Sequence, residues 1–286
     1  MTFPSGACLP TSPWRRIGFG CASALLFLAG LIFIPHPLLA QEETPPPATI
    51  NELLRSTDVK VIEQRADLFM VRKYYEEAST LYRRLTELQP NNALYFNKLG
   101  ISYHQLQNLD MAKKSYRRAV QLNPQYAQAV NNLAAIEYAQ KNYRPAILTY
   151  LKALQLTPGD AVMYSNLGTA YFAYEKFDYA VASYRYALLL DPNVFQRSGR
   201  VGTIVQQREE KNSAAFNFYL AKTYASVGDA ENTLQFLRKA WEEGYPDILK
   251  SIQEEKTFEF LAQDQRFLDL LALMQPKDTA ADQTAR

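Results

Sequence analysis

The most informative feature of the sequence is a set of four prolines separated by equal steps along the chain. A tyrosine stands at the same distance before each proline, and an alanine stands at a second constant distance before it. This agreement predicts internal repeats, in which each unit is one supersecondary element that buries its apolar face against its neighbours. The prolines are Pro90, Pro124, Pro158 and Pro192, the tyrosines are Tyr82, Tyr116, Tyr150 and Tyr184, and the alanines are Ala78, Ala112, Ala146 and Ala180.

The period of about 34 residues, with its small residue, aromatic residue and terminal proline, resembles the tetratricopeptide repeat (TPR), in which each unit is a helix, a turn and an antiparallel helix. The resemblance implies an all-α solenoid, a right-handed superhelix of antiparallel helix pairs with C-terminal capping helices. The first unit has Arg65-Ala66 where the family usually has Leu-Gly, so we expect it to act as the N-terminal cap. The expected units are 59–92, 93–126, 127–160 and 161–194, with a fifth, TPR-like unit at 214–247.

The unit at 93–126 matches the family best, and its residues have clear packing roles. Leu99 and Tyr103 are four positions apart and therefore share one helical face. Gly100 and Ala112 remove side-chain bulk where the two helices approach, and Pro124 prevents the second helix from continuing.

The N-terminal segment, 1–40, has the order of an export signal. Arg15 and Arg16 precede an uncharged apolar run at 17–34, and small residues lead to Ala40. This order predicts a signal peptide over residues 1–40 that is cleaved after Ala40. The alternative is an uncleaved anchor at 17–34, because the length of this run is near the lower limit for a membrane-spanning helix. Both interpretations place the rest of the chain outside the cytoplasm, in the periplasm or another extracytoplasmic space.

Removal of this segment changes the cysteine and charge content. Both cysteines, Cys8 and Cys21, lie within it, so the mature chain can form no disulfide. The segment also holds two of the 31 basic groups and none of the 29 acidic groups, so the remainder carries equal numbers of both. A neutral chain lacks the electrostatic footprint of a nucleic-acid binder, and we expect no nucleic-acid partner.

Four segments lie outside the repeat register. Residues 41–58 begin with a proline-rich stretch and are expected to be a linker, with helical structure beginning somewhere after Asn51. Residues 195–213 are interpreted as an insertion, a short hairpin or mobile loop that runs into a helix from about Gln206. It is either a second contact surface or a tolerated surface loop. Residues 248–274 should form capping helices, and 275–286 a disordered tail.

Tetratricopeptide proteins generally bind extended peptides or partner helices in a groove lined by their first helices, so the resemblance implies such a groove here. Asn132 and Asn166, one period apart, are candidates for an amide ladder that pairs with a peptide backbone, since a carboxamide both donates and accepts. Lys98 stands at the same place one unit earlier. The alternative is that asparagine is simply common there in the family. The expected lining is Asn97, Ile101, His104, Asn131, Asn132, Ala135, Tyr138, Ser165, Asn166, Thr169 and Phe172.

Some family members hold a partner's C-terminal carboxylate with lysines and asparagines on the first helices. Ile101, Ala135 and Thr169 stand where that asparagine is required, and no lysine accompanies them. We therefore expect no carboxylate clamp. The groove is predicted to be uncharged, aromatic and rich in amides, which suits a partner with apolar side chains.

The sequence offers no set of residues for catalysis. His104 is the only histidine after Ala40, which makes a zinc site improbable. Ser102 and His104 are two apart on one predicted helix and so point to different sides. Gly199 and Gly202 lack the spacing and the lysine of a phosphate loop. We expect no catalytic residues, no metal and no cofactor.

These observations favour a non-catalytic scaffold or adaptor of the cell envelope that binds a protein or peptide in its groove. The alternative is an accessory or regulatory subunit of an envelope enzyme complex that acts in cell-wall, polysaccharide or proteolytic processes. Membrane contact is expected only through the N-terminal segment, if that segment is not cleaved.

Overall fold

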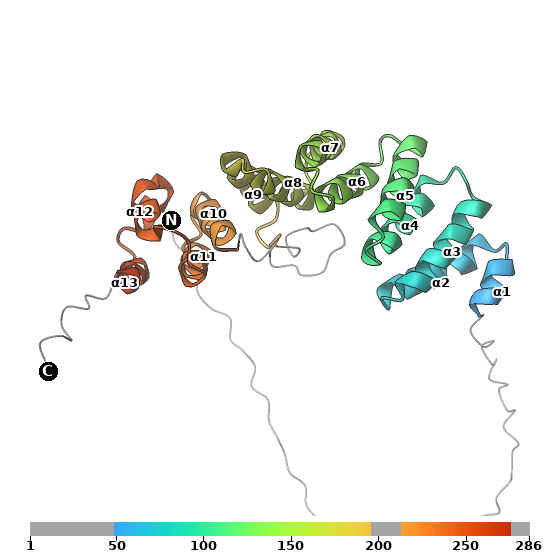
Figure 1. Cartoon of the computed structure of the whole chain (residues 1–286), viewed down its shortest axis with the longest axis horizontal. Coiled ribbons are helices and arrows are strands. Elements are labelled where there is room, and N and C mark those ends of the chain that lie inside the picture. The colour runs from blue at the N-terminus through green and yellow to red at the C-terminus, as the bar shows by residue number, and fades with distance from the viewer. Residues whose placement is uncertain (1–48, 196–212, 276–286) are drawn as a thin grey trace, which may run out of the picture. The chain divides into compact units, whose positions relative to one another are not determined.

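The structure is a computed structural model, and it describes residues 49–195 and 213–275. These residues form helices and no strand, and the helices follow one another in chain order (Figure 1). The elements are α1 (Ile50–Arg55), α2 (Val59–Val71), α3 (Tyr75–Leu88), α4 (Ala93–Gln105), α5 (Leu109–Leu122), α6 (Ala127–Ala139), α7 (Tyr143–Leu156), α8 (Ala161–Ala173), α9 (Phe177–Leu190), α10 (Ser213–Ala225), α11 (Ala230–Glu242), α12 (Ile248–Glu254), the 3₁₀-helix η3 (Lys256–Leu261) and α13 (Gln265–Met274).

The all-α solenoid expected from the repeats is confirmed. Five consecutive pairs pack against each other, from α2 with α3 to α10 with α11, and each of the first four pairs also packs against the next. The turn inside each of those four pairs contains one non-glycine residue in the left-handed region, with φ between 58° and 63°. In the fifth pair the equivalent turn residue is Gly228, which adopts φ 76° without strain. The four non-glycine residues are Lys73, Gln107, Lys141 and Glu175.

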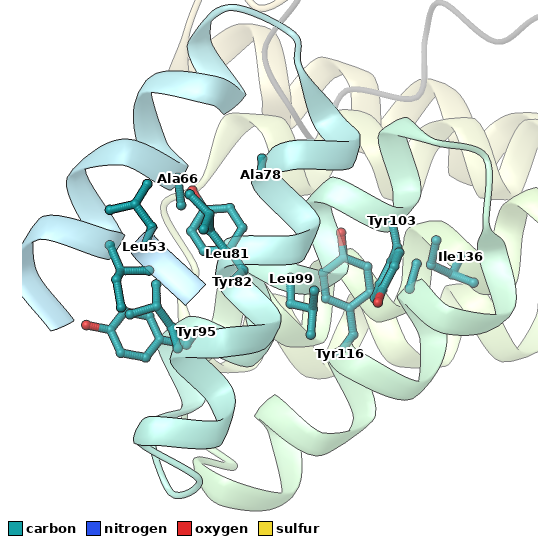
Figure 2. Packing of buried hydrophobic residues seen from close by; sticks show 13 residues of the cluster. Leu53, Ala66, Ala78, Leu81, Tyr82, Tyr95, Leu99, Tyr103, Tyr116 and Ile136 are labelled. Atoms are coloured by element: carbon teal, nitrogen blue, oxygen red, sulfur yellow. The ribbon is translucent and has the colours of Figure 1, made fainter. Parts of the chain in front are cut away.

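Within a pair, a tyrosine of the second helix packs against a small residue of the first. A Cβ atom at Gly100 would lie 2.6 Å from the Tyr116 ring, and one at Gly168 would lie 2.5 Å from the Tyr184 ring. Both distances are well below van der Waals contact, so glycine is required at these two positions. Figure 2 shows Tyr116 in one buried cluster with Leu99.

The segment expected to be a linker, 41–58, contains a helix. Thr49 and Glu52 form a capping box around the start of α1, since each side chain accepts a hydrogen bond from the other residue's backbone N–H. Leu53 is 2% exposed and belongs to the same buried cluster as Leu81 of α3 (Figure 2). Residues 50–55 of the predicted linker are therefore helical, because a capped N-terminus and one buried leucine hold that short helix against the first unit.

The C-terminal elements α12, η3 and α13 pack against the last pair. Phe258 of η3 and Phe267 of α13 share a buried cluster with Phe218 of α10. No helix of the described ranges is long and apolar enough to span a membrane. Residues 1–48, 196–212 and 276–286 lie outside the described residues. They hold the predicted signal peptide and most of the predicted insertion and tail.

Candidate interaction surface

The first helices of successive units lie beside each other. α4 contacts α6, and α6 contacts α8, so residues at equivalent positions come together across units. The structure buries most of the predicted groove residues and leaves three half-buried. The buried ones are Asn97, Asn131, Asn132, Ala135, Ser165, Asn166, Thr169 and Phe172, and the half-buried ones are Ile101, His104 and Tyr138.

The predicted asparagines form links between neighbouring first helices. The Nδ2 of Asn132 donates to the Oδ1 of Asn97 over 3.0 Å, and the Nδ2 of Asn166 donates to the Oδ1 of Asn131 over 3.2 Å. Asn97 in turn donates to the Tyr126 hydroxyl over 3.2 Å. Each of these amides thus has a partner inside the chain, which satisfies buried groups that would otherwise destabilise the fold. Contact of these side chains with a peptide stays a prediction.

Lys98 stands at the equivalent position one unit earlier, where it joins α4 to α2 through ion pairs. Its Nζ lies 2.8 Å from both a Glu63 and an Asp67 carboxylate oxygen of α2. The hydroxyls of Tyr82 and Tyr95 donate to Asp67 and Glu63, over 2.6 and 2.9 Å. Sequence reasoning identified Lys98 and missed both carboxylates, although their spacing of four positions on a predicted helix was a usable signal.

Lys98, Glu63, Asp67, Tyr82 and Tyr95 form a cluster in which burial and mutual hydrogen bonds shift the pKa values. Burial lowers the pKa of Lys98, but hydrogen bonds and charges from Asp67 and Glu63 outweigh burial, so the net pKa lies above its ordinary value. Burial, followed by the hydrogen bond to Glu63, raises the pKa of Tyr95 to about 12. Burial also raises the pKa of Tyr82, with Asp67 adding to the effect. The cluster is therefore a charged link at neutral pH, with both tyrosines protonated.

The predicted groove residues of α8 lie in the packing of the fourth unit. The Thr169 hydroxyl donates to the Ser165 carbonyl over 3.0 Å and accepts from the Tyr184 hydroxyl over 3.1 Å. Phe172 is 8% exposed, and its ring centroid lies 5.2 Å from that of Phe216 on α10. In this structure α10 thus packs over Phe172, so that ring belongs to the core rather than to an open groove.

The accessible part of the predicted groove is on α4 and α6. Ile101 and His104 come from α4 and Tyr138 from α6, and we call these three residues the α4–α6 surface. The Tyr138 ring centroid lies 5.6 Å from that of Tyr143. Burial lowers the pKa of His104, so the imidazole is neutral near pH 7. The α4–α6 surface is therefore an uncharged set of one aliphatic and two aromatic side chains that can also hydrogen-bond.

No group of three or more His, Cys, Asp or Glu residues within 49–195 and 213–275 could hold a metal ion. Ser102, near His104 in sequence, is buried and its hydroxyl donates to the Leu99 carbonyl over 2.8 Å. That hydroxyl is thus held by its own helix rather than directed at a base.

Comparisons with known proteins agree with this architecture. A family model described as tetratricopeptide repeat matches residues 93–126, and one described as TPR repeat matches residues 66–107. No curated protein matches the sequence significantly.

Solved structures similar to the chain are distant in sequence. MamA from Desulfovibrio magneticus RS-1 is 19% identical with a TM-score of 0.47, over 65% of this chain and 94% of that chain. YrrB, described as a TPR protein with an unusual peptide-binding site, is 16% identical with a TM-score of 0.46, over 73% of this chain and 100% of that chain. The first TPR of Spaghetti (RPAP3), bound to an HSP90 peptide, is 22% identical with a TM-score of 0.40, over 42% of this chain and 95% of that chain.

Proposed function

The chain is a tetratricopeptide-repeat protein, and we propose that it is a non-catalytic scaffold of the cell envelope that binds a peptide or a partner helix across α4 and α6. The observation that carries this proposal is the α4–α6 surface. Its side chains are uncharged and half-buried, while the Asn97 and Asn132 amides of the same two helices are already paired within the chain.

The chemistry of the surface suggests the chemistry of the partner. Ile101 and the Tyr138 ring favour apolar side chains, since burying apolar area is the main driving force for association. A neutral His104 presents one donor and one acceptor at its ring nitrogens, which suits a peptide backbone of any sequence. An extended segment or a helix with apolar residues on one face meets both requirements.

The envelope location is supported by the sequence alone. The apolar run at 17–34 follows two arginines and is long enough for export through the membrane, whether or not it is then removed. The partner is accordingly expected to be an envelope protein. An envelope enzyme captured as the partner would make this chain its accessory subunit.

The proposal is tested by site-specific photocross-linking in the native envelope. A benzoylphenylalanine at Tyr138 should yield one discrete adduct. The same substitution at Tyr179, a tyrosine that is 62% exposed on the second helix α9, provides the matched control and should not yield that adduct. Identical adducts from both positions, or none from Tyr138 in a chain with the wild-type helix content, would overturn the proposal.

A further inference from the structure

A cleft with an unusual charge lies away from the α4–α6 surface. It has a volume of about 720 Å³, within the range of ligand-binding pockets, and opens between the second helices α3 and α5 with residues of α4 between them. The lining residues are Arg83 of α3, Phe96, Leu99 and Tyr103 of α4, and Asp110, Met111, Lys113, Lys114, Ser115, Arg117, Arg118 and Gln121 of α5.

Five of these residues are cations and one is a carboxylate. The ion pairs observed among the described residues involve none of the five cations. Lys113 donates to the amide oxygen of Gln140 over 2.6 Å, and Arg118 lies over the Phe96 ring at 5.8 Å. In a chain whose basic and acidic groups nearly balance, this concentration creates a local positive potential that attracts anions.

The repeat fold does not require these charges. The residues one period later, on α7, are Ile147, Leu148, Leu151 and Lys152, so only one of the four corresponding places keeps a cation. Both helices nevertheless pack in the same way against their first helices. The cations of α5 are therefore a local feature of this unit rather than a consequence of solenoid packing.

The base of the cleft is apolar. Leu99 and Tyr103 are buried, Phe96 is half-buried and Met111 is 38% exposed. A ligand that fills the cleft must therefore offer negative charge at the rim and an apolar group at the centre, the arrangement in which a buried anchor supplies binding energy and rim charges supply orientation.

We propose that this cleft binds an acidic segment of a partner protein that carries one aromatic or large aliphatic side chain. The carboxylates pair with Lys114, Arg117 and neighbouring cations, and the apolar side chain packs against Phe96 and Met111. A flat anionic membrane can contact the exposed cations but cannot enter a cleft between helices, which favours a peptide. The chain thus has two separate docking surfaces, one uncharged and one basic.

The test measures binding of a fluorescein-labelled peptide with six Asp or Glu residues around one Phe to the full chain at low ionic strength. The double variant Lys114→Gln/Arg117→Gln should bind the peptide about tenfold more weakly, since each exposed charge contributes modestly. Arg238→Gln/Lys256→Gln, which removes two exposed cations elsewhere, is the matched control and should bind as the wild type does. Replacing the Phe of the peptide with Ser should also weaken binding.

Three results would overturn the proposal. The first is that the acidic peptide does not bind measurably. The second is that both double variants weaken its binding equally. The third is that the peptide binds equally well with Phe or with Ser. Anionic phosphatidylglycerol vesicles serve as the competing probe. Retention on these vesicles that is lost in Lys114→Gln/Arg117→Gln, without peptide binding, would assign the cations to a membrane surface instead.

Discussion

The first junction between repeat units and the next two junctions place different side chains at one equivalent position of the first helix. At the first junction Lys98 reaches two carboxylates of α2, whereas Asn132 and Asn166 each reach one asparagine of the preceding first helix. A charged link responds to pH and salt, and an amide link responds to neither. A solenoid can therefore keep one packing geometry from unit to unit while the response of each junction to pH and salt changes.

Both kinds of junction depend on intact helix pairs, so the largest effect is expected inside a unit. Gly168→Leu should lower the free energy of unfolding by about 3 kcal/mol, because even a Cβ atom there would meet the Tyr184 ring at 2.5 Å. Urea unfolding measures the change. Gly159→Leu is the control, since nothing lies within 4 Å of its Cβ position. Equal midpoints for the two variants would contradict this packing.

The amide junction is broken by Asn166→Ala. Asn166 is fully buried, and its loss leaves the Oδ1 of Asn131 without this donor, so we expect a destabilisation of about 2 kcal/mol. Asn91→Ala, at an exposed asparagine, should stay within about 0.5 kcal/mol of the wild type. The same unfolding experiment compares them, and a neutral Asn166→Ala would mean that the link contributes nothing.

The charged junction is broken by Lys98→Met, which keeps the apolar stem and removes the cation. We expect a smaller loss of about 1 kcal/mol, because the three charged side chains are between 22% and 45% exposed and water screens their attraction. A loss larger than that of Asn166→Ala would reverse the ranking of the two junctions.

The charged and the amide junctions should differ most clearly in how their contributions to the free energy of unfolding depend on pH. Lys98 has a raised pKa in the folded chain, so its contribution is complete below the unfolded value of about 10.4 and declines as pH rises above it. The destabilisation caused by Lys98→Met should therefore stay constant up to about pH 10 and shrink as pH rises further, through the raised folded pKa. That caused by Asn166→Ala should stay constant over the whole range. Parallel changes in both variants would show that the links do not differ in charge.

The sequence predicted contacts inside a unit better than contacts between units. Tyr116 opposite Gly100 recurs as Tyr184 opposite Gly168, and a repeated pair of this kind can be read from spacing alone. The partners of Asn132 and Lys98 depend on the offset between neighbouring first helices, which no single unit encodes.

Two further differences have local causes. Phe172 was expected in the groove, but its ring packs against Phe216 of α10, a helix outside the run of four regularly spaced units. Helix α1 is short and carries no repeat signature, so it depends on its cap and on the burial of Leu53. Both features arise from tertiary packing, which periodicity does not report.

The most direct test of the scaffold function is the yield of the Tyr138 cross-link when a charge is placed on the α4–α6 surface. His104→Glu introduces a carboxylate beside the proposed apolar partner, while Gln155→Glu introduces one at an exposed position of α7. We expect the adduct to be lost in His104→Glu and kept in Gln155→Glu. An undiminished adduct in His104→Glu, in a chain with the wild-type unfolding midpoint, would contradict binding across α4 and α6.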